Sequence, residues 1–125
     1  MRRNVQSGSP YEELYGFARA VRVGDRVLVS GTAPIPQDGS EPPDSAFEQM
    51  TLCASIALAA LGDLGGSVTD VVRTRMLITD PAHADEVGRA HGQVFGDVRP
   101  AATMVVTGLL DERWKVEFEL DALLA

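Results

Sequence analysis

Residues 115–121 have the sequence Lys-Val-Glu-Phe-Glu-Leu-Asp, in which apolar and acidic side chains alternate from Val116 to Asp121. Successive side chains of a strand point to opposite faces of a sheet, so this alternation predicts a β-strand with one apolar and one acidic face. The three carboxylates face water or meet cationic partners, because a buried unpaired charge is costly. The arginines that could pair with them are Arg19, Arg73, Arg75 and Arg99.

Two further strands are predicted near the beginning of the chain. The β-rich segments Phe17–Val23 and Arg26–Thr32 are joined by Gly24-Asp25, a dipeptide typical of a hairpin turn. The second segment ends at Ser30-Gly31-Thr32, where the glycine permits another group to approach the backbone closely.

Two helices follow from capping signals and from apolar residues at helical spacing. Ser45-Ala46-Phe47-Glu48 is a capping box, and Asp80-Pro81 combines an N-cap with proline at the first helical position. The first apolar stripe comprises Phe47, Met50, Ala54, Ala57 and Leu61. The second comprises Ala84, Val87, Gly88, His91, Val94 and Phe95. Both stripes indicate core-facing helices.

The remaining strands are expected at Val71–Ile78, from about Ala101 to Thr107, and from Lys115 to about Leu123. The order β-β-α-β-α-β-β predicts a single α+β domain over residues 1–125, with two helices on one face of one sheet. Met104-Val105-Val106 is apolar on both sides. The uncovered sheet face is therefore expected to meet another subunit, with a symmetry that periodicity leaves open.

Composition excludes several classes of function. The 125 residues carry a net charge of −7, which disfavours nucleic-acid binding, and no apolar run reaches the ~18 residues of a membrane span. One cysteine, Cys53, fits a reducing cytoplasm, and with only His83 and His91 beside it no zinc site is expected. Cys53 and His91 lie on apolar stripes and are interpreted as core residues.

Glycine-rich segments give no support for phosphate binding or for hydrolase chemistry. Gly62-Asp63-Leu64-Gly65-Gly66 lacks the Lys-Ser/Thr of a P-loop and is interpreted as a helix terminator. The chain has no Gly-x-Ser-x-Gly nucleophile elbow. The Pro34–Pro43 segment is an exposed loop inside the domain.

An ordered set of segments resembles the RidA/YjgF family from about Tyr15 to the C-terminus. The set comprises Tyr15–Asp25, Val29–Thr32, Val71–Thr74, Arg99–Ala101 and Lys115–Glu119. The resemblance implies a chorismate-mutase-like fold and a homotrimer with a barrel-like core and small-molecule clefts between subunits. It also implies hydrolysis of reactive enamines and imines to 2-keto acids and ammonia, without metal or organic cofactor.

The resemblance also implies a set of site residues. Glu117 matches a catalytic glutamate that positions the attacking water, Ser30-Gly31 matches backbone that completes the pocket, and Phe17 stands where an aromatic residue lines the cleft. The family's Pro-Ala-Arg-Ser segment, whose arginine binds the substrate carboxylate, corresponds to Pro100-Ala101-Ala102-Thr103. Ala102 therefore replaces the arginine, and Thr103 follows it.

The missing arginine removes a planar fork that makes two charge-assisted bonds to a carboxylate. Arg19 shares a face with Phe17 and is the better substitute cation, whereas Arg99 is expected on the strand face opposite Ala102. The leading hypothesis is a cytoplasmic homotrimer that binds or transforms a small molecule but is not a standard 2-imino-acid deaminase. The alternatives are a deaminase that uses Arg19 and a non-catalytic ligand-binding or regulatory trimer. A ribonuclease is disfavoured by the acidic charge.

Overall fold

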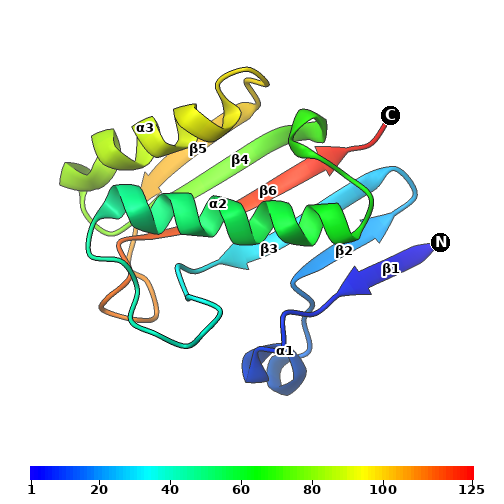
Figure 1. Cartoon of the computed structure of the whole chain (residues 1–125), viewed down its shortest axis with the longest axis horizontal. Coiled ribbons are helices and arrows are strands. Elements are labelled where there is room, and N and C mark those ends of the chain that lie inside the picture. Colours follow the sequence, from blue (N-terminus) through cyan, green and yellow to red (C-terminus); the bar gives the residue numbers. More distant parts are fainter.

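A computed structural model describes the whole chain, residues 1–125, as one sheet flanked by helices (Figure 1). The strands are β1 (Arg2–Val5), β2 (Ala20–Val23), β3 (Arg26–Thr32), β4 (Val71–Ile78), β5 (Ala101–Val106) and β6 (Val116–Leu123). The helices are α1 (Pro10–Tyr15), α2 (Ala46–Asp63) and α3 (Ala84–Phe95), with 3-10 turns at Val68–Asp70 and Pro81–His83. The sheet order is β1-β2-β3-β6-β4-β5. Only β4 and β5 are parallel; the other pairs are antiparallel.

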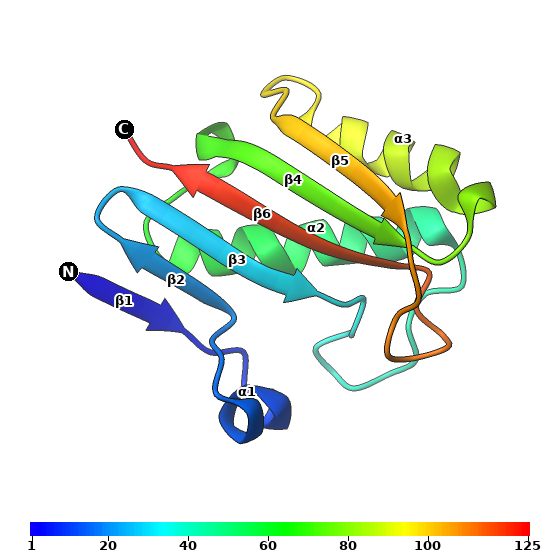
Figure 2. The same ribbon diagram turned by 180° about the vertical axis from the view of Figure 1, so that it is seen from behind.

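The predicted α+β layer arrangement is confirmed. Helices α2 and α3 lie side by side across one face of the sheet, and the view from behind shows the strands uncovered (Figure 2). The Ser45 hydroxyl caps α2 by accepting a hydrogen bond from Glu48 N at 3.0 Å. Gly96 ends α3 with its amide bonded to the Gly92 carbonyl.

The prediction of five strands and two helices was incomplete, because the structure adds β1 and α1 at the N-terminus. β1 is a four-residue edge strand of mostly polar residues, so it lacks the apolar alternation that marks a strand in sequence. The predicted first hairpin strand also begins later, at Ala20, because α1 ends at Gly16 in a left-handed conformation and the chain must turn before entering β2.

The core lies between α2, α3 and the apolar face of the sheet. Phe118, Leu120 and Val116 of β6 are fully buried there, as the alternation in residues 115–121 predicts. Phe95 of α3 packs on Phe118 with ring centroids 5.8 Å apart. The acidic residues of β6 occupy the other face, which no helix covers (Figure 2).

Apolar side chains remain exposed on that open face of the sheet. Leu28 of β3 and Leu123 of β6 are 46% and 50% exposed, and Val105 of edge strand β5 is 45% exposed. Uncovered apolar surface on a small domain is typical of an interaction face. This open face is the one that the sequence analysis expects to meet another subunit.

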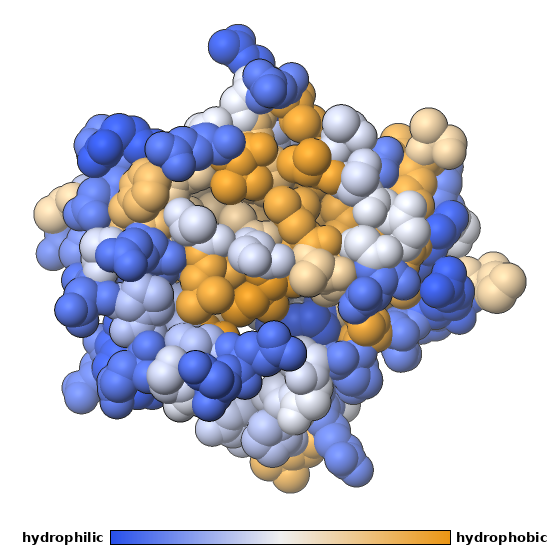
Figure 3. Space-filling model, viewed as in Figure 1, coloured by the Kyte–Doolittle hydropathy of each residue, from blue (hydrophilic) through white to orange (hydrophobic).

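The opposite side of the molecule is apolar over α2, where Figure 3 shows apolar side chains gathered along the helix. Between Glu48 and Asp63 this helix contains no charged residue, and Leu52 and Ile56 are only half-buried. None of the helices has the length and apolar content that a membrane crossing requires.

Candidate functional site

A β-bulge between β3 and β6 shapes the candidate site. Val29 pairs with Leu120 and Thr32 pairs with Phe118, so β3 has one residue more than β6 between these two pairs. The extra residue lies in the Ser30-Gly31 segment. Bulges of this kind redirect side chains and are common beside active sites. Here the bulge brings the Gly31 backbone against the side chain of Glu117.

The carboxylate of Glu117 lies directly over Gly31. A Cβ atom built on Gly31 would stand 2.7 Å from Glu117 Oε2, closer than real Cβ contacts. Glycine is therefore the residue that leaves room for this carboxylate. Burial raises the pKa of Glu117 above its ordinary value, with the nearby charge of Arg19 opposing the rise and that of Glu119 adding to it.

Glu117 is the only one of the three β6 carboxylates without an ion pair within 4.0 Å. Arg75 of β4 lies 3.2 Å from Glu119 and 3.7 Å from Asp121, which confirms it as a partner of the acidic row. Arg73 donates instead to the Thr103 hydroxyl at 2.8 Å. The carboxylate that remains available for a ligand is thus that of Glu117.

Arg19 lies beside Gly31 and Glu117. Its Nη2 donates to the Gly31 carbonyl at 3.0 Å, and its Nε is buried without a partner. The guanidinium carbon is 6.0 Å from the centre of the Phe17 ring. Burial lowers the pKa of Arg19, while the charges of Glu12 and Glu117 oppose this. One chain thus brings together Phe17, Arg19, Ser30, Gly31 and Glu117.

Glu12 of α1 is a member of this group that the sequence analysis did not identify. Its side chain is only 2% exposed and accepts hydrogen bonds from Ser7 N at 2.8 Å and from the Ser7 hydroxyl. The signal was present in Ser9-Pro10-Tyr11-Glu12, a helix start with glutamate three residues after serine. Glu12 places a second carboxylate near Arg19.

A surface hollow of about 550 Å³ opens between α1, β1 and the beginning of β2, and of this group it is lined by Glu12, Phe17 and Ser30. Its lining includes Asn4, Gln6, Glu12, Phe17, Ala18, Val21 and Ser30. The Ser30 hydroxyl donates to the Ala18 carbonyl at 2.7 Å, which fixes the two sides of the hollow against each other. The hollow is large enough for a small metabolite.

The structure does not bring Ala102 and Thr103 to Glu117 within one chain. Both lie on edge strand β5, which β4 separates from β6. Ala102 pairs with the fully buried Thr74 and so faces the helix layer, whereas Thr103 is on the open face with Arg73. Only a neighbouring copy could bring residue 102 near Glu117.

The prediction for Arg99 was wrong, because it assumed that Arg99 and Ala102 lie on one regular strand. Arg99 precedes β5 and has a φ of 56°, in the left-handed region, so it is not part of a regular strand. Its amide closes the turn after α3 by donating to the Phe95 carbonyl at 2.8 Å. Arg99 is exposed at the beginning of the edge strand.

The contacts of His91 and Cys53 are those of residues that support the fold. His91 Nε2 and the Thr74 hydroxyl are 2.8 Å apart, and the imidazole packs on Phe95 at 4.8 Å between ring centroids. Burial lowers the pKa of His91 and raises that of the Cys53 thiol. No group of three histidine, cysteine or acidic side chains is arranged to hold a metal ion.

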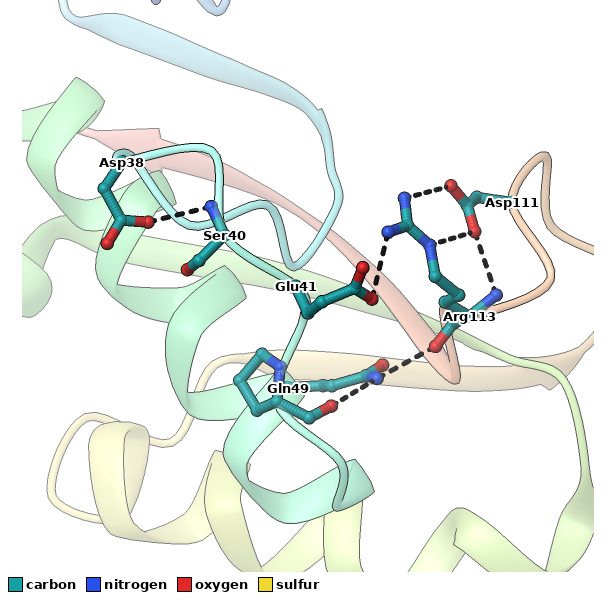
Figure 4. A network of polar contacts seen from close by, with 7 residues as sticks. Asp38, Ser40, Glu41, Gln49, Asp111 and Arg113 are labelled. Carbon is teal, nitrogen blue, oxygen red and sulfur yellow. Dashed lines mark hydrogen bonds and ion pairs between the residues drawn. The ribbon is translucent and has the colours of Figure 1, made fainter.

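Gln49 connects the two loops that flank the Gly31–Glu117 end of the sheet (Figure 4). Its Nε2 donates to the carbonyls of Pro43 at 2.8 Å and Arg113 at 3.0 Å, and its Oε1 accepts from Lys115 N at 2.7 Å. Arg113 also reaches Glu41 across the same gap at 3.2 Å. These bonds fix the chain two residues before Glu117. A lone glutamine in an apolar helix was the available sequence signal.

Comparison with known proteins agrees with the fold and with the ordered segments. The family model described as Endoribonuclease L-PSP matches residues 10–124. The chain is 42% identical over 121 residues to the uncharacterized protein SCO2049 of Streptomyces coelicolor, covering 96% of this chain and 90% of that protein. It is 30% identical to the RutC family protein y4sK of Sinorhizobium fredii, with 82% of each covered.

A solved structure of a similar protein has the same fold. The crystal structure of Rv2704 from Mycobacterium tuberculosis, a member of the YjgF/YER057c/UK114 family, superimposes with a TM-score of 0.90. The two sequences are 39% identical, and the match covers 99% of this chain and 100% of the other. The chain therefore belongs to the endoribonuclease L-PSP family, the family of YjgF and RidA.

Proposed function

We propose that this protein is a homotrimer whose intersubunit clefts bind or transform a small molecule, with Glu117 as the catalytic or binding carboxylate. The observation that carries the proposal is the carboxylate of Glu117, which has no ion pair and lies over Gly31, the residue after Ser30 in the lining of the hollow. The open sheet face, with its exposed Leu28 and Leu123, supports assembly through the sheets. In such a trimer Ala102 of a neighbouring copy would stand where the family places its arginine.

The chemistry suited to this site is addition of water to a carbon–nitrogen double bond. A carboxylate with a raised pKa accepts a proton more readily than an ordinary one, which suits Glu117 to activate a water molecule. The water oxygen bonds to the imine carbon, the nitrogen gains protons, and cleavage of the carbon–nitrogen bond releases ammonia and a carbonyl compound. None of these steps needs a redox partner.

We do not propose a standard 2-imino-acid deaminase, because the methyl side chain of Ala102 cannot bind the substrate carboxylate. Each charge-assisted hydrogen bond lost with the arginine is worth about 1.5–3 kcal/mol. The alternative is a deaminase in which Arg19 supplies the cation. The position of Arg19, close enough to Glu117 for their charges to interact, supports this alternative.

One assay separates these functions. A pyridoxal-phosphate dehydratase generates 2-aminoacrylate, and keto-acid release is followed with and without the protein. Inactivity of the natural protein together with turnover by Ala102→Arg would establish the missing arginine as the reason. Clear acceleration by the natural protein, abolished by both Glu117→Ala and Arg19→Ala, would instead establish the deaminase.

A non-catalytic ligand-binding trimer is the remaining alternative. Thermal-shift screening with small metabolites tests it, since a ligand that stabilises the protein without being converted would favour binding alone. Sedimentation at micromolar concentration tests the trimer. A monomer under those conditions would remove the intersubunit cleft on which all three functions depend.

A further inference from the structure

One N–H of the Arg19 guanidinium is already bonded to the protein backbone. Nη2 donates to the Gly31 carbonyl at 3.0 Å, and Nε, its neighbour on the same edge of the fork, is buried without a partner. Bidentate recognition of a carboxylate needs two parallel N–H groups on one accessible edge. In this arrangement Arg19 stabilises the bulge at Gly31, and its Nε–Nη2 edge is not offered to a ligand.

The charge of Arg19 is also opposed from both sides. Glu12 and Glu117 both act on its pKa, and Ser7 holds the Glu12 carboxylate in place. The charged residues in and beside the hollow are two arginines and three glutamates, namely Arg2, Arg19, Glu12, Glu13 and Glu117, which leaves a formal charge of −1. Arg2 and Glu13 are both exposed, so solvent weakens the effect of each on a ligand, and the balance of −1 rests on Arg19, Glu12 and Glu117. A carboxylate ligand would therefore add like charge to an acidic site.

The remaining lining suits an uncharged or cationic molecule. Phe17 is 40% exposed and presents an aromatic ring, and Ala18 and Val21 add apolar surface. Asn4 and Gln6 add neutral hydrogen-bonding groups. The Phe17 ring already has the Arg19 guanidinium 6.0 Å from its centre, so it serves a ligand as apolar surface. The acidic balance of the site favours a cation, and protonated amines and imines are cations of suitable size for a hollow of about 550 Å³.

We propose that the ligand of this site lacks a carboxylate, and that the substrate class is the imine formed when a primary amine is oxidised. This inference rests on the proposed function of Glu117. The imine and one water give an aldehyde and one ammonia: the water oxygen bonds to the imine carbon, Glu117 takes a water proton and returns it to nitrogen, and the carbon–nitrogen bond breaks. No electrons are exchanged.

A matched pair of probes isolates the carboxylate. Phenethylamine with a flavin-dependent amine oxidase and L-phenylalanine with an amino-acid oxidase give imines that differ only in that group. Each imine releases one ammonia on hydrolysis, so the rate of ammonia release, followed with glutamate dehydrogenase and NADH, reports hydrolysis of both imines. The natural protein is expected to accelerate hydrolysis of the amine-derived imine at least tenfold more than that of the imino acid. Ala102→Arg, at an exposed position, is expected to reverse the preference.

A greater acceleration with the imino acid would overturn the inference and favour the alternative deaminase. Binding of the stable pair phenethylamine and phenylalanine, measured by calorimetry with the same variants, distinguishes the other failures. Binding of phenethylamine alone without turnover of its imine would support the ligand class and refute catalysis by Glu117. Equal or tighter binding of phenylalanine would refute the ligand class whatever the turnover.

Discussion

The carboxylate of Glu117 lies directly over the backbone of Gly31 at the β3–β6 bulge. A Cβ atom on residue 31 would lie 2.7 Å from Glu117 Oε2. The backbone of one strand thereby sets the position of the carboxylate on the next. The extra residue of β3 shifts the register with β6 and forms the bulge. The same shift in register therefore sets the geometry of the site.

Gly31→Ala is predicted to displace the Glu117 carboxylate while leaving the fold intact. The clashing atom is the end of a flexible side chain, so the free energy of unfolding should change by no more than about 1 kcal/mol. Misplacement of a catalytic group by about 1 Å costs on the order of 100-fold in rate. Urea unfolding and the imine hydrolysis assay measure the two effects separately.

Gly62→Ala is the matched control for that variant. Gly62 lies in α2 and a Cβ there meets nothing within 4 Å, so alanine should raise stability by about 0.5–1 kcal/mol and leave turnover unchanged. An active Gly31→Ala protein would show that Glu117 does not need its present position.

Gln49→Leu is predicted to destabilise the fold by about 2–4 kcal/mol, because three backbone groups lose the partner that Gln49 supplies. The variant should also weaken ligand binding, since Lys115 is two residues from Glu117. Urea unfolding measures the first effect and calorimetry with phenethylamine the second. Gln93→Leu, at an exposed position of α3, should leave both nearly unchanged.

Thr74→Val is predicted to cost about 1–3 kcal/mol, since it removes the hydroxyl that bonds His91 Nε2 inside the core at nearly constant side-chain volume. Thr107→Val, at an exposed position whose side chain has no hydrogen bond, is the control. Equal stability of the two variants would mean that His91 finds another partner. Thermal unfolding at neutral pH makes the comparison.

Most of the fold could be predicted because its main elements bury one face each. Alternation in β6 and the helix start at Ser45 both report burial or hydrogen bonding within a few residues, and both are confirmed, with Ser45 as the N-cap of α2. β1 and α1 bury little apolar surface of their own, so no periodicity marks them. Pairing with β2 stabilises β1, and that contact is visible only in three dimensions.

The candidate site was less accessible to sequence reasoning. Its residues come from segments far apart in the chain, and the resemblance supplied Glu117 and Gly31. Nothing local shows that a bulge turns them toward each other, or that Arg19 donates to the Gly31 carbonyl. Glu12 and Gln49 act through contacts with distant backbone or charge, which residue type alone does not reveal.

Glu117→Gln is predicted to be more stable than the natural protein at neutral pH, with a difference that disappears in acid. Burial raises the pKa of Glu117 in the folded state, so the native protein binds the proton more tightly than the unfolded chain. The cost of burying the ionised carboxylate is absent below the unfolded pKa of about 4.3 and is complete above the folded pKa. Thermal unfolding of both proteins between pH 3 and pH 8 follows this difference.

The same raised pKa predicts how turnover depends on pH. If Glu117 takes the proton from water, imine hydrolysis falls as pH drops through the folded pKa, which lies above the ordinary value of 4.5. Glu119→Gln is the control, because it removes an ion pair with Arg75 and leaves Glu117 in place. That variant should be no more stable than the natural protein. Its turnover should still fall in acid, at a slightly lower pH, because the charge of Glu119 helps to raise the pKa of Glu117. A pH profile of turnover that is flat between pH 4 and pH 7 would exclude Glu117 as the proton acceptor.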